Sequence, residues 1–446
     1  MTQSRRLATG SAISALLALL TLFVVGPGLD ATQADLPARL TDEEFWSLSQ
    51  ELSEPNGFFQ SDNLLSNETG YQLVIPELIS KVGEGGVYLG VGPEQNFTYI
   101  AALKPRIAFI LDVRSGNRDL HLMYKALFEL AADRAEFVSL LFSRAKPADL
   151  PRDAAPAELF AAFDAVTPVE ADYERNLARI KERLVETHHL PLSSEELKGI
   201  EYVYGNFFRF GPGIGYSSSR SGRVGGGPTY ATLMRMTDAA GAMRSFLASE
   251  ANFEVVKRLE SANLVVPVVG NFSGPKSLRA VAAWLRDRNA KVSAYYLSNV
   301  EDYLSRDGTW LDFCRNAAAL PLAEKSLFIR SGGGYRPAAR STPPIPPPPP
   351  APIPSDQINA LVSKGGGTIT LPDGRVVTVV TSGSADTGFR VATFGIGSMG
   401  TNRLGPIADD LAPCAPAKMG VGVGPGSDPE PQGSHPGLTP TRRRLR

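Results

Sequence analysis

The sequence contains few of the residues that build metal centres and disulfide frameworks. It has two cysteines, Cys314 and Cys414, and four histidines in 446 residues. Two isolated cysteines indicate neither a disulfide framework nor a cysteine metal site, although they leave a single bridge open. The histidines show no metal-ligand spacing either. They are His121, His188, His189 and His435. We therefore expect no bound metal.

The sequence also lacks a surplus of charge of either sign. Its 45 Lys and Arg residues nearly balance its 46 Asp and Glu residues, which gives a formal net charge of −1. This balance gives no electrostatic reason to expect nucleic acid as a partner. A G-x-S-x-G segment, the nucleophile elbow of many serine hydrolases, is absent as well. The partner that we expect is a small molecule, and the sequence does not indicate an oligomeric state.

The longest apolar run near the N-terminus is short for a membrane span. It extends from Ala12 to Val25, follows Arg5 and Arg6, and precedes a small-residue stretch that ends at Ala34. This order is typical of a secretory signal peptide, and the run is shorter than the ~20 residues that cross a bilayer. We predict that residues 1–34 are a signal peptide and that the rest is exported, periplasmic or secreted. The alternative is an uncleaved signal, through which the protein would contact the membrane.

Short β-prone runs and helical patterns alternate after residue 81. The runs that predict strands are Val87–Val91, Arg106–Leu111, Leu264–Val269, Lys291–Leu297 and Ser326–Arg330. Between the second and third runs, helical spacing predicts a large insertion at about 115–260, roughly 150 residues in place of a short crossover. Strands that alternate with helices pair in parallel. We therefore predict an α/β fold, with a Rossmann-like, mostly parallel sheet over residues 81–340.

The segments on either side of this domain have different compositions. Residues 35–80 show helical spacing after a capped start at Thr41, which predicts a helical segment packed on the core. The proline run of residues 341–356 predicts a stiff polyproline linker. Residues 357–446 are rich in glycine, proline and small residues, which predicts a disordered low-complexity tail. Within it, Gly367–Thr381 can form one small hairpin.

Residues 86–114, GVYLGVGPEQNFTYIAALKPRIAFILDVR, carry the clearest indication of a ligand site. Gly90 and Gly92 allow close approach to the backbone, and the helix predicted from Asn96 directs its N-terminal N–H groups at this turn. Asp112 ends the next strand. Its separation from Gly90 in the sequence is close to the ~20 residues that lie between a phosphate or adenosine loop and the carboxylate that accepts hydrogen bonds from the ribose hydroxyls. The pattern favours a nucleoside-type ligand without indicating a reaction.

From Tyr71 to Arg330 the sequence resembles the class I S-adenosylmethionine-dependent methyltransferases. The resemblance implies a Rossmann-like fold that binds S-adenosyl-L-methionine. In that family the glycine turn approaches the methionine part of the cofactor, which here implies Gly90 and Gly92. The acid that ends the second strand, matched by Asp112, binds the ribose hydroxyls, and a polar residue after the third strand, matched by Asn271, contacts the adenine.

The resemblance also implies that the end of the fourth strand faces the reacting group. No catalytic residue follows directly, and the candidates at this place are Tyr295, Asn299 and Glu301. The Ser-Asn-Val ending at Ser298–Val300 and the helical excursion are similar to those of aminocarboxypropyl-transferring relatives such as betaine-lipid synthases. The segments VGPEQNFTYIAAL, HLMYKALFE and YYLSNVEDYL also look like those of an uncharacterised bacterial family.

Two further features each have two interpretations. The segment Tyr202–Gly227, rich in glycine, serine and aromatic residues, is too long for a simple connector and predicts either a lid or binding loop or a disordered stretch. His121 and Lys125 are four residues apart on a predicted helix and could share a functional face. The simpler interpretation is a packed helix with two polar edge residues.

Two functions agree with these patterns. The first is a group transferase that uses S-adenosylmethionine, because methyl transfer needs proximity and in-line geometry more than it needs a catalytic triad. Export argues against it, since the cofactor is not expected outside the cytoplasm. The second is a non-catalytic exported binding protein that uses the same cleft for a small ligand or an envelope component.

Overall fold

The computed structural model describes residues 35–222, 227–331 and 402–414, together with three short strands between residues 367 and 393. The predicted signal peptide and the polyproline linker lie outside the described residues. Within the described part, each helix is too short or too polar to cross a membrane.

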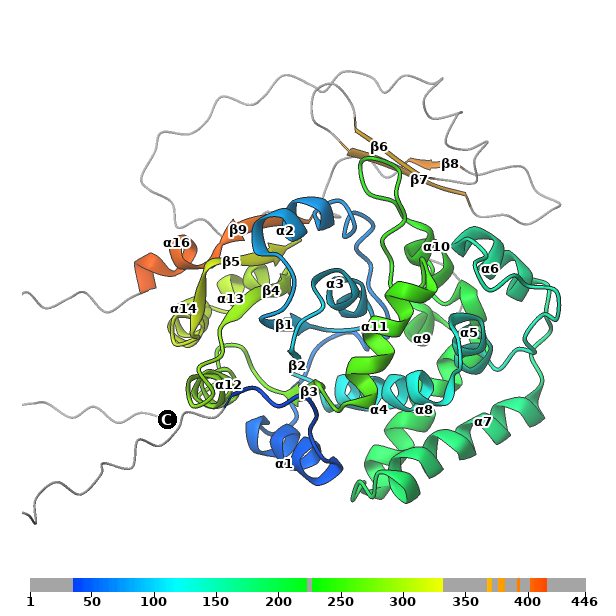
Figure 1. Ribbon diagram of the computed structural model, residues 1–446, viewed down its shortest axis with the longest axis horizontal. Helices are drawn as coiled ribbons and strands as arrows, with labels where there is room; N and C mark the ends of the chain where they lie inside the picture. Colours follow the sequence, from blue (N-terminus) through cyan, green and yellow to red (C-terminus); the bar gives the residue numbers. More distant parts are fainter. Residues whose placement is uncertain are drawn as a thin grey trace, which may run out of the picture. The chain divides into compact units, whose positions relative to one another are not determined.

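A mixed six-stranded sheet, in the order β3-β2-β1-β4-β5-β9, organises the fold (Figure 1). The first five of these strands are parallel, and β9 runs antiparallel to β5. The strands are β1 (Val87–Val91), β2 (Ile107–Asp112), β3 (Val265–Val269), β4 (Val292–Ser298), β5 (Leu322–Arg330) and β9 (Arg403–Pro406). The predicted α/β class and the mostly parallel sheet are therefore confirmed.

The central strands are continuous apolar runs because both of their faces are covered. Every residue of β1, β2 and β3 is buried, which is the usual state of parallel strands between helical layers. Helix α3 (Gln95–Leu103) contacts β1, and helices α4 (Ser115–Leu130) and α1 (Asp42–Leu52) contact β3. A ligand site can therefore form at the carboxyl ends of the strands.

The segment between β2 and β3 is helical along most of its length (Figure 1). After α4 it contains α5 (Arg134–Phe142), α6 (Pro156–Asp164), α7 (Glu170–Glu182), a π-helical turn (Arg183–Thr187), α8 (Ser194–Phe210), a 3-10 turn (Gly211–Gly213), α9 (Ser218–Ser221), α10 (Tyr230–Arg235) and α11 (Glu250–Ser261). Buried aromatic rings pack this segment against the sheet. The ring of Phe128 lies 4.5 Å from that of Phe137 and 5.1 Å from that of Phe97 on α3.

The N-terminal segment packs on the sheet through α1. Thr41 caps this helix: its Oγ1 accepts the Glu44 N–H at 3.1 Å, and Glu44 Oε2 accepts the Thr41 N–H at 2.8 Å. This reciprocal pair satisfies two backbone donors that the helix itself leaves free. One turn before the end of α1, the Ser49 hydroxyl donates to the Pro267 carbonyl of β3 at 2.6 Å.

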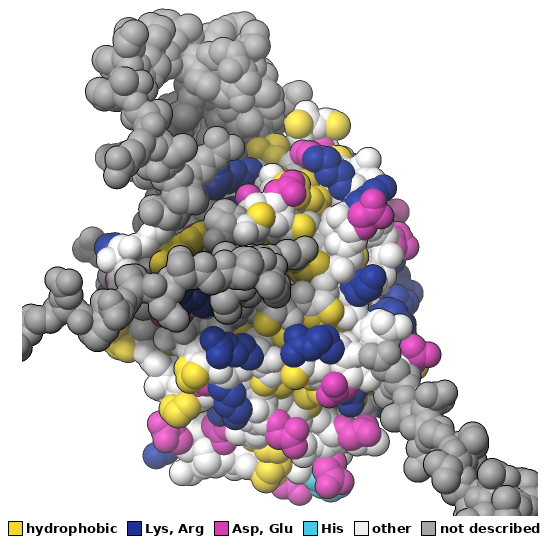
Figure 2. Space-filling view, turned by 90° about the vertical axis from the view of Figure 1, so that its left-hand side faces the viewer, with side chains coloured by type: hydrophobic (Ala, Val, Ile, Leu, Met, Phe, Trp, Pro, Cys, Tyr) yellow, Lys and Arg dark blue, Asp and Glu magenta, His cyan; other side chains and the backbone are white. Residues whose placement is uncertain are grey.

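The other described helices lie before β1, after β3 or near β9. They are α2 (Ile75–Val82), α12 (Ser277–Arg286), α13 (Val300–Arg306), α14 (Trp310–Ala318), α16 (Ile407–Leu411) and a 3-10 turn (Ala412–Cys414). On the face drawn in Figure 2, basic and acidic side chains are interspersed, as the balanced composition leads one to expect.

Residues 403–414 join the main sheet, although the sequence analysis places them in the tail. Leu327 of β5 lies opposite Pro406 of β9. After β9, the side chain of Ile407 is fully buried, and Cys414 forms a disulfide with Cys314 of α14, with 5.7 Å between their Cα atoms. The composition of the tail gave no sign of this strand, because four residues are too few for a periodic pattern.

The predicted hairpin lies in a separate small sheet. Strands β6 (Gly367–Thr370) and β7 (Val376–Thr381) pair antiparallel, with Gly367 opposite Val379. A third strand, β8 (Val391–Thr393), pairs with β7. The tail therefore contains more strand than the sequence analysis predicts.

Candidate functional site

A cleft opens at the carboxyl ends of β1, β2 and β4. The chain passes from β1 to β2 and β3 on one side and then returns to β4 on the other side of β1. The connections after β1 and β4 therefore leave in opposite directions, and such a switch point is the usual ligand crevice of parallel sheets. The cleft encloses about 680 Å³, including space open to solvent.

Four parts of the chain form the walls of this cleft. Residues 91–93 and 112–114 lie at the ends of β1 and β2, residues 298–300 lie at the end of β4, and an irregular segment before α2 contributes Phe59, Asn63 and residues 65–68. Single residues from elsewhere complete it. They are Tyr216, Phe272, Tyr296 and Tyr303.

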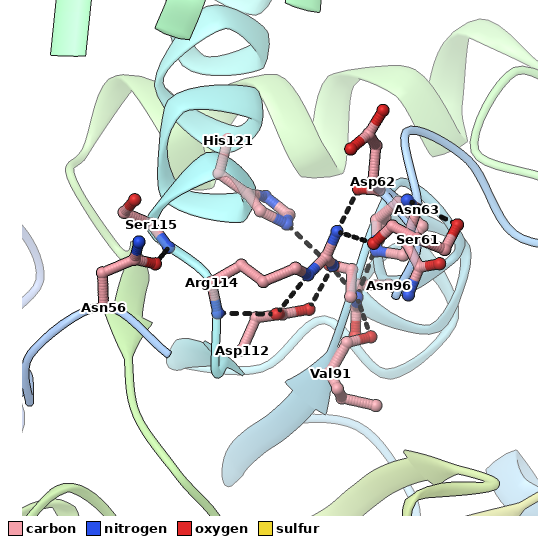
Figure 3. A network of polar contacts seen from close by, with 12 residues as sticks. Asn56, Ser61, Asp62, Asn63, Val91, Asn96, Asp112, Arg114, Ser115 and His121 are labelled. Carbon is pink, nitrogen blue, oxygen red and sulfur yellow. Dashed lines mark hydrogen bonds and ion pairs between the residues drawn. The ribbon is translucent and has the colours of Figure 1, made fainter. Parts of the chain in front are cut away.

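The two predicted glycines have different roles at the turn after β1. Gly92 lines the cleft and has φ of +75°, a conformation that glycine adopts without strain. Gly90 leaves room for the Asn96 side chain, since a Cβ there would collide with it and would lie 2.9 Å from the Tyr88 ring. Asn96 Nδ2 donates to the carbonyls of Val91 at 3.0 Å and Gly92 at 3.2 Å (Figure 3). Asn96 thus fixes the turn.

His121 supports the same turn from α4. Its Nε2 donates to the Gly92 carbonyl at 2.9 Å (Figure 3), and its Nδ1 has no hydrogen-bond partner. Burial lowers the pKa of His121 to about 4, so the imidazole is neutral at neutral pH. Lys125, one turn later, is also buried. The helix is packed, as the simpler interpretation expects, but these two residues are buried and do not lie at its edge.

Asp112 lies in the cleft, and Arg114 holds its carboxylate. Arg114 Nε donates to Oδ1 at 2.9 Å, Nη2 donates to Oδ2 at 2.7 Å, and the Arg114 backbone N–H donates to Oδ1 at 3.0 Å (Figure 3). Both side chains are almost fully buried. Arg114 Nη1 also donates to the carbonyls of Ser61, at 3.0 Å, and of Asp62. The pair therefore joins the end of β2 to the irregular segment.

Glu68 is a site residue that the sequence analysis missed. Its Oε1 accepts hydrogen bonds from Ser298 Oγ and, at 2.6 Å, from Ser331 Oγ, and its Oε2 accepts from Gln95 Nε2 at 2.9 Å. Ser298 has φ of +52°, which is strained for a residue with a Cβ and is common where a site is held in place. Glu68 lies in an irregular stretch without periodicity, and the polar run SNET was its only signal.

Glu94 lies behind the cleft, at the start of α3, and is fully buried. Its two carboxyl oxygens lie 3.3 Å from the Ser66 backbone N–H, which donates to them. Burial raises the pKa of Glu94 to about 8, and the nearby charge of Glu68 adds to the shift. A buried carboxyl of this kind is protonated at neutral pH.

One of the three catalytic candidates lies in the cleft. Asn299 lines it, but Tyr295 is fully buried on the other face of β4, with its ring centroid 5.7 Å from that of Phe328. Glu301 instead forms an ion pair with Arg330, whose Nη2 lies 3.2 Å from Glu301 Oε1. Successive side chains of a strand point to opposite faces. This alternation places Tyr296 in the cleft, with Ser298 two residues later.

Asn271, the candidate for contact with an adenine, is exposed and does not line the cleft. Its Oδ1 accepts the Ser273 backbone N–H at 3.0 Å and the Ser273 hydroxyl at 2.9 Å. Asparagine commonly closes a turn on its own backbone in this way. The neighbouring Phe272 lines the cleft in its place.

The segment Tyr202–Gly227 contributes to the cleft through one residue. Tyr202–Phe210 belongs to α8 and is helical, so the prediction of an irregular loop is wrong for this part. Beyond it, Tyr216 lines the cleft. Residues 223–226 lie outside the described residues.

The described residues also bear on metal binding. The described ranges contain no group of three or more His, Cys, Asp or Glu residues placed to hold an ion.

Comparison with known proteins gives one family. A family model described as a domain of unknown function (DUF7790) matches residues 64–197 and 216–342, together more than half of the chain. These residues include Gly92, Asp112 and the end of β4. No curated protein matches the chain.

Proposed function

Since the chain belongs to the family described as a domain of unknown function (DUF7790), we propose its function from the site: the cleft binds S-adenosyl-L-methionine, and the protein transfers a group from it. The observation that carries this proposal is the meeting of Gly92, Asp112 and residues 298–300 around one cleft at the switch point of the sheet. These residues are far apart in the sequence, and they are the ones to which the methyltransferase resemblance assigns cofactor binding and the place of the reacting group.

The topology supports a Rossmann-like interpretation of the fold. The order of the parallel strands, β3-β2-β1-β4-β5, agrees with that of doubly wound nucleotide-binding sheets. On this interpretation the helices from α4 to α11 are an insertion in the crossover from β2 to β3. The antiparallel β9 takes the place of a sixth parallel strand.

The Asp112 carboxylate can still accept a ribose hydroxyl beside Arg114. A carboxylate has about four acceptor positions. Oδ1 accepts two N–H groups of Arg114, and Oδ2 accepts one. The remaining acceptor position on Oδ2 is left for a hydroxyl donor. Arg114 fixes the orientation of the Asp112 carboxylate and therefore the direction of this position.

The end of β4 is the place for the acceptor. Sulfonium cofactors carry their own leaving group, so the protein contributes mainly position and exclusion of water. Asn299, Tyr296 and Tyr303 line this end of the cleft. Burial raises the pKa of Tyr296 well above its ordinary value, so its hydroxyl stays protonated and can donate a hydrogen bond. On this proposal Tyr296 takes the place that the sequence analysis gave to Tyr295.

We predict that the full chain binds S-adenosylmethionine and its homocysteine product, and that Asp112→Asn weakens this binding about 10- to 100-fold. The expected loss corresponds to one hydrogen bond to a charged group, about 1.5 to 3 kcal/mol. Titration calorimetry measures it. The full chain is needed because residues 403–414 complete the sheet.

Asp302→Asn is the matched control for this titration, since Asp302 is an exposed acid on α13 outside the cleft. It should bind both ligands as the wild type does. Circular dichroism of Asp112→Asn is needed beside it, because the change leaves Arg114 with a weaker partner. Absence of binding to the folded wild type at millimolar ligand would refute the transferase.

The second candidate is a non-catalytic exported protein that binds another small ligand in the same cleft. The Cys314–Cys414 disulfide favours it, because such bonds persist mainly in oxidising compartments, where S-adenosylmethionine is not expected. A folded, exported wild type that binds neither S-adenosylmethionine nor its homocysteine product would support this candidate.

A further inference from the structure

A second hollow shares Arg114 and Phe59 with the cleft as walls. It encloses about 730 Å³, including space open to solvent, and lies between residues 56–64 and the helices α4 and α8. The residues beside it that bear charge or a ring are Phe58, Phe59, Asp62, Arg114, Asp119 and Tyr202. Neither the proposed transferase nor the methyltransferase resemblance uses Phe58, Asp62, Asp119 or Tyr202.

Asp119 is the residue of this hollow that lacks a partner. Its side chain belongs to α4, only 6% of the residue is exposed, and its Oδ1 has no hydrogen-bond partner. Gly199 of α8 gives it room, because a Cβ there would lie 2.8 Å from Asp119 Cγ. A buried carboxyl without a partner is costly. Such a group in a folded protein requires an explanation, and a ligand that donates hydrogen bonds provides one.

The surrounding charges leave this hollow acidic. Arg114 directs its guanidinium to Asp112 and to two backbone carbonyls, and Arg118 forms an ion pair with Glu196 at 2.5 Å. Asp62 therefore stands with Asp119 as a second acid at the hollow, and its Oδ2 accepts the Tyr202 hydroxyl at 2.8 Å.

Aromatic rings lie at the opening of the hollow. Phe58 is 88% exposed and Tyr202 is 51% exposed. An exposed phenyl ring is unfavourable in water, and the alkyl part of a bound ligand would remove it from water. Two carboxyl groups and an exposed ring around one hollow are thus complementary to a small organic cation.

We propose that this hollow binds a small ligand with a primary ammonium group, which donates hydrogen bonds to Asp119 and Asp62 while its alkyl part lies against Phe58. The ammonium group supplies the donors that the Asp119 carboxyl lacks. A neutral alcohol of the same length would offer a single donor and no charge. This second site is independent of what the cleft binds.

The test is a calorimetric titration of the full chain with n-butylammonium, with n-butanol as the neutral probe. We expect heat of binding for the ammonium and none for the alcohol. Asp119→Asn should weaken ammonium binding about 10- to 100-fold, the loss of one charge-assisted hydrogen bond. The variant removes a poorly solvated charge, so we expect it to fold.

Asp149→Asn is the matched control, because Asp149 is an exposed acid outside this hollow. It should bind n-butylammonium as the wild type does. Phe58→Ala, at a residue with almost no packing to lose, should weaken binding several-fold. The proposal is overturned if the wild type does not bind the ammonium at millimolar concentration, if it binds butanol equally well, or if Asp119→Asn binds like the wild type.

A pH series gives a second readout on the same proteins. Burial raises the pKa of Asp119 to about 7. The charged form binds an ammonium better, so the affinity of the wild type should be higher at about pH 8 than at about pH 6, and Asp119→Asn should lose most of this difference. The other charged groups that face Asp119 are Asp62, Arg114, Arg118, Glu195 and Glu196.

Discussion

At the scale of single residues, the carboxyl groups near the cleft differ in how their burial is compensated. Asp112 has a bidentate arginine, and Glu68 has two hydroxyls and an amide. Glu94 has the Ser66 backbone N–H, at 3.3 Å from both oxygens. A long hydrogen bond of this kind does not replace the hydration of a charge. Of these three carboxyl groups, Glu94 is therefore the one whose ionisation should cost the fold most.

We predict that the free energy of unfolding falls as pH rises from about 5 to about 8, and that Glu94→Gln reduces this fall. The pKa of Glu94 is raised from 4.5 to about 8. Between these values the folded protein keeps a proton that the unfolded chain has released, so a rise in pH favours unfolding. The destabilisation by Glu94 is absent below pH 4.5 and is complete above about pH 8.

Denaturant unfolding at several pH values measures this effect, which we expect to be on the order of a few kcal/mol. Glu182→Gln is the control, because Glu182 is exposed on α7 and its loss should leave the pH profile unchanged. A Glu94→Gln profile as steep as that of the wild type would contradict the prediction.

At the scale of elements, a buried lysine connects α4 to its neighbours. Lys125 Nζ lies 2.7 Å from Glu129 Oε1 on the same helix and donates to the Glu260 carbonyl of α11 at 2.7 Å. His188 Nε2 contacts Glu129 from the turn after α7. Burial alone would raise the pKa of Glu129, but the hydrogen bonds from His188 and Lys125 hold it below its ordinary value.

We predict that Lys125→Met destabilises the protein by about 3 to 5 kcal/mol, because it leaves Glu129 buried without its lysine partner. Denaturant unfolding measures the loss. The double variant Lys125→Met/Glu129→Gln removes both charges and should be more stable than the single variant. Lys181→Met, which breaks the exposed Lys181–Glu201 pair between α7 and α8, should change stability by less than about 1 kcal/mol. Equal losses in the two single variants would contradict the prediction.

The central elements could be predicted because burial on both faces leaves a plain signal in the sequence. Val87–Val91 was predicted with the bounds that β1 has, and the predicted runs at β2, β3 and β4 differ from the observed strands by no more than one residue at each end. The cap of α1 was also predicted, because a threonine three residues before a glutamate has a specific hydrogen-bonding geometry. Thr41 and Glu44 form this capping box.

The site was predicted only in part, because side-chain direction and long-range pairing are not local properties. Asp112 and Gly92 were found from their places after strands. Tyr295 was predicted in place of Tyr296. Side chains alternate between the two faces of a strand, so Tyr296 shares a face with Ser298 and Tyr295 does not. Glu68 could not be found, since three distant side chains define its position.

At the scale of the whole molecule, the segment of residues 403–414 closes the edge of the sheet. The disulfide joins positions separated by 100 residues, and Arg330 of β5 pairs with Asp410 of α16. A crosslink over a loop of this length stabilises a fold by about 5 kcal/mol on the chain-entropy argument. This contribution requires an oxidising environment.

We predict that a tagged full-length protein is recovered from the exported fraction of a bacterial host, without residues 1–34 and with Cys314 joined to Cys414. The signal pattern and the disulfide lead to the same compartment by independent routes. Fractionation with mass spectrometry of the N-terminus and of the cysteine peptides measures both. A cytoplasmic, unprocessed protein with two free thiols would contradict the prediction, and it would remove the main argument against catalysis.

The position of β9 in the chain also affects the order of folding. Ribosomes produce β5 some seventy residues before β9, as the numbering of Arg330 and Arg403 shows. During that interval the backbone groups of β5 that pair with β9 lack this partner, and an unpaired edge invites association with other chains. The nascent protein is therefore most exposed to aggregation just before β9 emerges, and a chaperone or a delay in folding would be most useful at that stage.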